Sequence, residues 1–82
     1  MNQYVFTVKG MRCGMCESHI NDAIRRCARI KKVKSSHFKD ETIVVADELD
    51  IDKIKFEIRQ LGYDVDDNVI VSEYKKKFLG IF

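Results

Sequence analysis

The fold is decided by YVFTVKGMRCGMCESHINDAI, residues 4–24 of an 82-residue chain. Its first part alternates β-branched and aromatic residues, so we expect a strand over residues 3–9. From Cys16 onward the apolar side chains recur one helical turn apart, which predicts a helix over residues 15–28. Two cysteines lie at the junction of this strand and this helix, and they raise the question of function.

The remaining sequence continues the alternation of strands and helices. Residues 30–38 and 42–46 are typical of two short strands, and the polar KDE between them predicts a hairpin turn. A helix follows, with an apolar stripe made of Ile51, Ile54, Ile58 and Leu61. A last strand begins at Tyr63 or at Val69. The order β-α-β-β-α-β predicts an α+β, ferredoxin-like fold, in which two helices cover one face of a four-stranded antiparallel sheet.

Composition limits the classes of partner and compartment. Apolar residues make up 45% of the chain and charged residues 34%, which is the balance of one globular domain. The net charge of +2 is too small to favour nucleic acid as the main partner. We find neither a secretory signal nor an apolar run long enough to cross a bilayer, so we expect a cytoplasmic protein without stable membrane insertion.

Cys13 and Cys16 form a Cys-x-x-Cys motif in a chain with three cysteines. A reducing compartment disfavours a structural disulfide, so the pair indicates metal binding or redox chemistry. The helix N-terminus favours thiolates, and two soft thiolates suit Cu(I). CGMC is also similar to the motif of thioredoxin-like enzymes, but those depend on a cis-proline and this chain contains no proline. Metal binding is the favoured interpretation, with a redox couple or a structural pair as alternatives.

The other candidate ligands are weaker. Cys27 follows Cys16 by eleven residues, about 16 Å along a helix, so we expect it in the core. His19 lies one turn beyond Cys16 and could add a third ligand that would suit Zn²⁺. His37 is expected to lie away from the cysteine loop, and Met15 is expected to be an exposed spacer. The sequence contains no catalytic triad, paired-carboxylate cleft or phosphate loop, so we expect no enzymatic activity.

The stretch GMRCGMCESHINDAI, residues 10–24, resembles the G-M-x-C-x-x-C signature of heavy-metal-associated domains. This family includes bacterial copper chaperones and the N-terminal modules of metal-transporting P-type ATPases. The resemblance extends through LGYD at 61–64 and covers about residues 3–72. It implies one Cu(I) held between Cys13 and Cys16 and passed by ligand exchange to a P-type ATPase or its metal-binding domain. A Zn²⁺, Cd²⁺ or Hg²⁺ carrier is the alternative within the family.

The resemblance also assigns supporting residues and exposes departures. Met11 corresponds to a methionine that is buried under the metal loop, and Tyr63 to a residue that approaches the metal site. Arg12 stands where the family commonly has threonine. Ser35 and His37 occupy positions of the second strand that are usually apolar, so this strand is expected to pack differently.

Residues 1–73 are expected to form the heavy-metal-associated domain, and residues 74–82 a basic and apolar tail. The tail carries three lysines and four large apolar residues, Phe78, Leu79, Ile81 and Phe82. Such a tail could pack on the domain, form a homodimer contact or touch a membrane surface.

Overall fold

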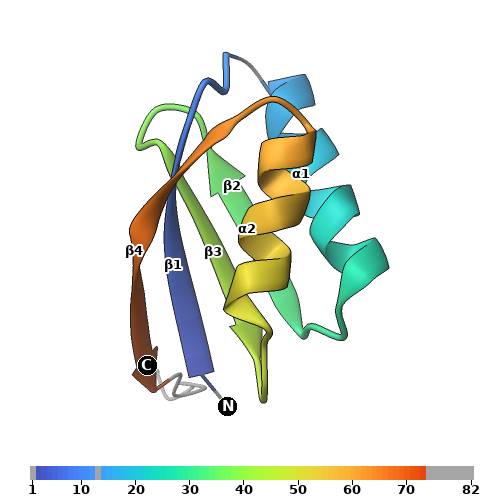
Figure 1. Cartoon of the computed structure of the whole chain (residues 1–82), viewed down its shortest axis with the longest axis vertical. Coiled ribbons are helices and arrows are strands. Elements are labelled where there is room, and N and C mark those ends of the chain that lie inside the picture. Colours follow the sequence, from blue (N-terminus) through green and yellow to red (C-terminus); the bar gives the residue numbers. More distant parts are fainter. Residues whose placement is uncertain (1, 13, 74–82) are drawn as a thin grey trace, which may run out of the picture.

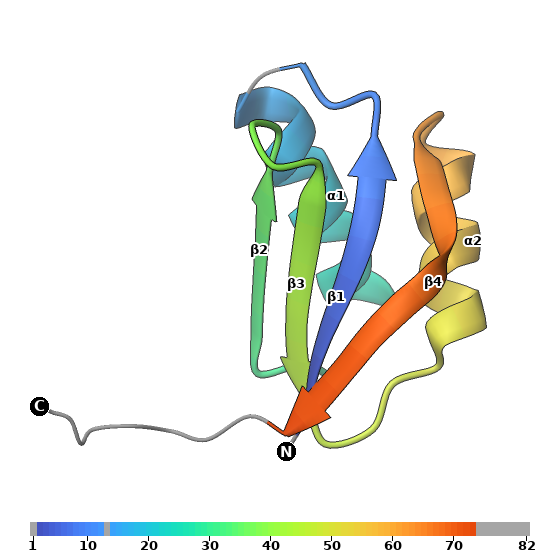
Figure 2. The same cartoon turned by 90° about the vertical axis from the view of Figure 1, so that its left-hand side faces the viewer.

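The computed structural model describes residues 2–12 and 14–73, which form a single sheet with two helices on one of its faces (Figures 1 and 2). The elements are β1 (Asn2–Lys9), α1 (Gly14–Cys27), β2 (Lys32–Ser36), β3 (Glu41–Ala46), α2 (Ile51–Gln60) and β4 (Asp64–Glu73). The four strands are ordered β2-β3-β1-β4, and every neighbouring pair is antiparallel. The predicted β-α-β-β-α-β fold is therefore confirmed.

The core lies between the sheet and the helices. On β1, every second side chain is buried, with Phe6 at the centre of the sheet and fully inaccessible. The apolar stripes of both helices pack against it, because their residues recur at helical spacing. Leu61, which was expected to end the second stripe, follows α2 and is 41% exposed. The buried cluster comprises Tyr4, Phe6, Val8, Met11, Ile20, Ile24, Val33, Val44, Ile54, Ile58 and Val65.

The β2–β3 connection differs from the prediction. β2 ends at Ser36, so His37 and Phe38 belong to the turn and not to the strand that was expected over residues 30–38. Asp40 adopts a positive φ of 54°, a conformation that aspartate tolerates better than most residues. This explains how the hairpin turns without a glycine. The Asp40 carbonyl also accepts a 2.8 Å hydrogen bond from the Val8 backbone N–H, which ties the turn to β1.

β4 begins at Asp64, close to the earlier of its two predicted starts. Its pairing with β1 shifts between Phe6 and Val8, so the polar residues 66–68 are accommodated in an irregular stretch of the strand. Arg59 on α2 braces this stretch, because its Nη2 donates to the Val65 carbonyl at 3.0 Å and to Asp67 Oδ1 at 3.2 Å.

Three connections meet at one end of the molecule (Figures 1 and 2). They are the β1–α1 loop with the cysteine motif, the β2–β3 turn, and the link from α2 to β4. Within residues 2–12 and 14–73, neither helix is long and apolar enough to cross a membrane. The tail predicted at residues 74–82 lies outside the described residues.

Candidate metal site

Cys16 lies in the first turn of α1, which begins at Gly14 inside the Cys-x-x-Cys motif. The backbone N–H groups of the first helical turn point toward this end, and the helix dipole places positive potential there. An anionic thiolate is therefore favoured at this position. The Cys16 side chain is half-buried and packs against the core. Cys13 lies outside the described residues, so the pairing of the two sulfurs remains a prediction.

Two contacts support the loop that leads to the motif: one with the core and one with Tyr63. Met11 is 6% exposed and belongs to the core cluster, as the resemblance implied. Gly10 has a φ of +106°, which favours glycine. A Cβ at Gly10 would lie 3.4 Å from Cδ1 of Tyr63, so the tyrosine ring packs against the start of the loop. Tyr63 therefore lies beside the loop, while its expected approach to the metal site stays a prediction.

The remaining candidate ligands lie where the sequence placed them, with one exception. Met15 is 69% exposed, and His19 is exposed on α1. Cys27 ends α1, packs against the core, and its thiol donates to the Ile24 carbonyl at 3.5 Å. Burial raises the pKa of the Cys27 thiol, and the nearby Glu57 carboxylate adds to this rise. These contacts support a packing role for Cys27.

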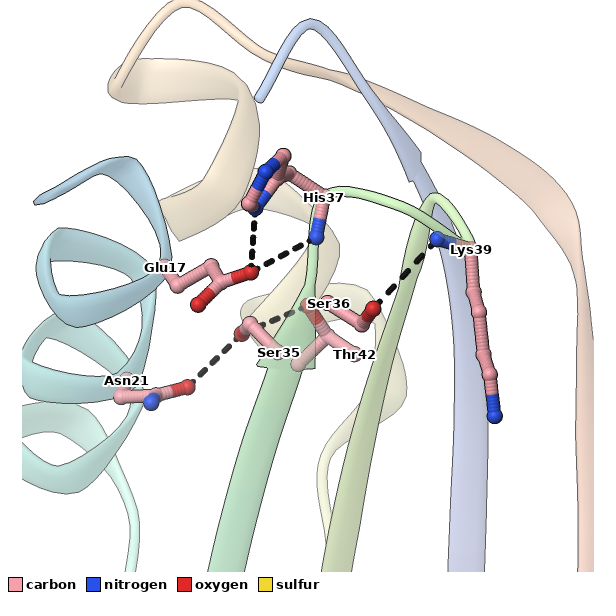
Figure 3. Close-up of polar contacts among 7 residues, drawn as sticks. All are labelled: Glu17, Asn21, Ser35, Ser36, His37, Lys39 and Thr42. Atoms are coloured by element: carbon pink, nitrogen blue, oxygen red, sulfur yellow. Dashed lines mark hydrogen bonds and ion pairs between the residues drawn. The ribbon is translucent and has the colours of Figure 1, made fainter. Parts of the chain in front are cut away.

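The exception is His37, which was expected to lie away from the cysteine loop. It lies beside the first turn of α1, where it contacts Glu17, the residue that follows Cys16 (Figure 3). Glu17 Oε2 accepts the His37 backbone N–H at 2.8 Å and lies 2.6 Å from His37 Nδ1. The backbone hydrogen bond, followed by the ring contact, lowers the pKa of the Glu17 carboxyl. Glu17 is therefore an ionised acceptor held against the β2–β3 turn.

A second contact joins α1 to β2 one helical turn further along. Ser35 Oγ donates to Asn21 Oδ1 at 2.7 Å and lies 3.0 Å from Thr42 Oγ1 on β3 (Figure 3). The single Ser35 proton is directed to Asn21, so the Thr42 hydroxyl donates to Ser35. Together with the Glu17–His37 contact, this forms what we call the polar seam: Glu17, Asn21, Ser35, His37 and Thr42. The seam explains how β2 packs with polar residues at positions that are usually apolar.

Sequence reasoning missed the polar seam, although its spacing was visible. Glu17 and Asn21 are four residues apart and share a face of a helix, while Ser35 and His37 are two residues apart at the end of a predicted strand. These spacings mark two polar positions on each segment, but they do not show that the two segments meet there.

Among residues 2–12 and 14–73, no three histidine, cysteine, aspartate or glutamate side chains form a group that could hold a metal ion. In particular, Glu17 and His37 do not combine with Cys16 into such a group. The nearest further cysteine in the sequence is Cys13, so a two-thiolate site would pair Cys16 with it, as the resemblance implies. Such a site suits a soft ion of low coordination number.

Comparisons with known proteins point to one family. The sequence profile of the heavy-metal-associated domain matches residues 5–64. The copper chaperone CopZ of Enterococcus hirae is 35% identical over 63 residues, which cover 74% of this chain and 91% of CopZ.

Two solved structures with a similar fold bind different metals. The yeast copper transporter domain Ccc2a, in its apo and Cu(I)-loaded states, gives a TM-score of 0.74 at 28% identity and covers 80% of this chain and 93% of its own. The N-terminal domain of ZntA in its Zn(II) form gives a TM-score of 0.74 at 23% identity and covers 79% of this chain and 89% of its own. The likeness to ZntA concerns the fold alone.

Proposed function

Because the chain belongs to the heavy-metal-associated domain family, we propose that it is a copper chaperone that binds one Cu(I) between Cys13 and Cys16. The observation that carries this proposal is the match to CopZ, since 91% of that copper chaperone aligns with this chain. The position of Cys16 at the N-terminus of α1 supports it further, because that position stabilises an anionic sulfur ligand.

Two thiolates provide a complete site for Cu(I) and an incomplete one for Zn²⁺. Cu(I) is a soft d¹⁰ ion that prefers sulfur, whereas structural Zn²⁺ is almost always four-coordinate. Among the described residues, no group of three histidine, cysteine, aspartate or glutamate side chains is placed to hold Zn²⁺. The donor set therefore favours Cu(I) as the cargo.

Transfer follows from the same low coordination number. An incoming thiolate from a partner attacks the open side of the bound Cu(I), one Cu–S bond to this chain breaks, and a second exchange completes the transfer. Only metal–sulfur bonds form and break, so copper stays Cu(I) and no substrate is chemically altered. We propose the metal-binding domain of a P-type ATPase as the acceptor, and the reducing cytoplasm, which keeps both thiols available, as the setting.

Anaerobic titration of the reduced chain with Cu(I) against a chromophoric chelator tests this function. We expect one Cu(I) per chain, lost in the Cys13→Ser/Cys16→Ser variant. Cys27→Ser makes the same chemical change at a thiol that packs against the core, and it is the matched control that should retain binding. Cu(I) binding that survives in the double variant would contradict the proposal.

Transfer is measured separately. The Cu(I)-loaded chain is mixed with an apo metal-binding domain such as yeast Ccc2a, and both are followed by NMR. A chromophoric chelator in the mixture reports any Cu(I) that is released into solution. We expect Cu(I) to move to the acceptor without binding to this chelator. If Cu(I) first dissociates into solution and only then binds to the acceptor, ligand exchange is contradicted.

A further inference from the structure

Glu17 is the carboxylate that follows the metal motif most closely in sequence, one residue after Cys16 and four after Cys13. A carboxylate oxygen is a good ligand for Zn²⁺ and a poor one for Cu(I). A glutamate at this position could therefore supply a further ligand to Zn²⁺ at the cysteine pair.

In the structure this carboxylate is engaged elsewhere. Its Oε2 accepts from the His37 backbone N–H and contacts the His37 ring nitrogen Nδ1, at 2.8 Å and 2.6 Å (Figure 3). The Glu17 and His37 side chains are 24% and 23% exposed. Glu17 thus points to the β2–β3 turn and forms no metal-binding group with Cys16 and a third described residue.

We propose that His37 is a metal-specificity residue, which holds the Glu17 carboxylate against the β2–β3 turn and so keeps it from completing a Zn²⁺ site at the cysteine pair. This inference rests on the proposed function, because it assumes that Cys13 and Cys16 hold the metal. His37 acts through Glu17, so it is a positioning residue and not a ligand.

The contact can be removed without detaching α1. One turn along the helix, Ser35 still bonds Asn21 at 2.7 Å, and Ile20 and Ile24 remain buried in the core. His37→Ala deletes the ring contact and leaves the backbone N–H, so Glu17 is released in part. The side chain of His37→Asn carries an amide N–H two bonds from Cβ, as Nδ1 is in histidine, so it should restore the restraint.

The experiment measures Zn²⁺ and Cu(I) affinities of the reduced full chain, each metal added alone against a chelator. Breaking a charge-assisted hydrogen bond should raise the Zn²⁺ affinity of His37→Ala about tenfold. Its Cu(I) affinity should stay within about twofold of the wild type, since the two sulfurs are unchanged. His37→Asn should resemble the wild type. Adding Glu17→Gln to His37→Ala should cancel the gain, because an amide is a weaker zinc ligand.

A spectroscopic measurement separates this effect from a general loosening of the loop. The ¹³C carboxyl resonance of Glu17 should move on Zn²⁺ addition in His37→Ala and stay in place in the wild type. If His37→Ala binds Cu(I) normally but its Zn²⁺ affinity and its Glu17 resonance behave as in the wild type, the inference is wrong and the proposed function stands. If the wild-type chain holds no Cu(I) at its cysteines, the proposed function and this inference both fail.

Discussion

The two helices begin in different ways. α2 is capped by Asp50, whose Oδ1 accepts the Lys53 backbone N–H at 3.2 Å. α1 begins inside the Cys-x-x-Cys motif, and its first turn is fixed from the side by the Glu17–His37 contact. The start of α2 therefore serves stability, while the start of α1 carries Cys16, the proposed metal ligand, and takes its support from the β2–β3 turn. Each helix start can be altered alone, so the comparison can be tested.

The largest effect is expected from Cys16→Ser. A serine hydroxyl is a poor ligand for Cu(I), so binding should fall below detection in the chelator competition. The free energy of unfolding of the apo protein should change by about 1 kcal/mol or less, because a half-buried thiol is replaced by a group of similar size. Urea unfolding measures this second quantity. A large loss of stability would show that the start of α1 is structural after all.

Next in size is Ser35→Ala, which breaks the centre of the polar seam. The Thr42 hydroxyl is fully buried and would lose its partner, and Asn21 would lose a donor. We expect urea unfolding to show a loss of about 1 to 3 kcal/mol. Ser36→Ala is the matched control, because Ser36 accepts only a long, exposed 3.4 Å bond from Lys39 and should cost little. Equal effects of the two substitutions would contradict the assignment of the seam.

Asp50→Ala tests the cap of α2 and should cost about 1 kcal/mol of unfolding free energy. Asp50→Asn should retain most of the stability, because its side-chain oxygen can still accept the Lys53 N–H. Neither substitution should alter Cu(I) affinity. A change in Cu(I) affinity in Asp50→Ala would mean that the two helix starts are coupled, contrary to the comparison.

The smallest effect concerns Cys27 at the other end of α1. Burial disfavours its thiolate and raises its pKa, so at a given pH below that pKa the thiolate fraction is lower than in the unfolded chain. In Cys13→Ser/Cys16→Ser, where Cys27 is the sole cysteine, iodoacetamide should therefore react more slowly with the folded than with the urea-unfolded protein. The rate should rise at higher pH in the folded state. Identical rate–pH profiles in both states would contradict the burial of this thiol.

Much of the fold could be predicted because it depends on local patterns. Alternation identified β1, and apolar residues at helical spacing identified both helices. The hairpin was predicted, but its turn begins two residues earlier than expected, because His37 and Phe38 continue the pattern of β2 in sequence and belong to the turn in the structure. The start of β4 was uncertain because the polar residues 66–68 resemble a turn in sequence. In the structure they remain within β4, opposite the register shift between Phe6 and Val8 of β1.

Only the part of the candidate site that is formed by residues close in sequence could be predicted. The place of Cys16 followed from the strand, the loop and the helix, whereas the burial of Met11 was expected from the family resemblance. The Glu17–His37 contact joins residues twenty positions apart and depends on how α1 is rotated over β2. No pattern within either element fixes that rotation, and His37 lies in the turn after β2, where the alternation of a strand no longer predicts the direction of a side chain.

In the proposed function, the Cys-x-x-Cys motif at the start of α1 holds Cu(I) through two sulfurs. Copper K-edge X-ray absorption of the Cu(I)-loaded, reduced wild-type chain tests it most directly. We expect copper to be coordinated by two sulfur atoms, without nitrogen or oxygen. A shell of three or four sulfurs, or one containing a histidine nitrogen, would contradict it.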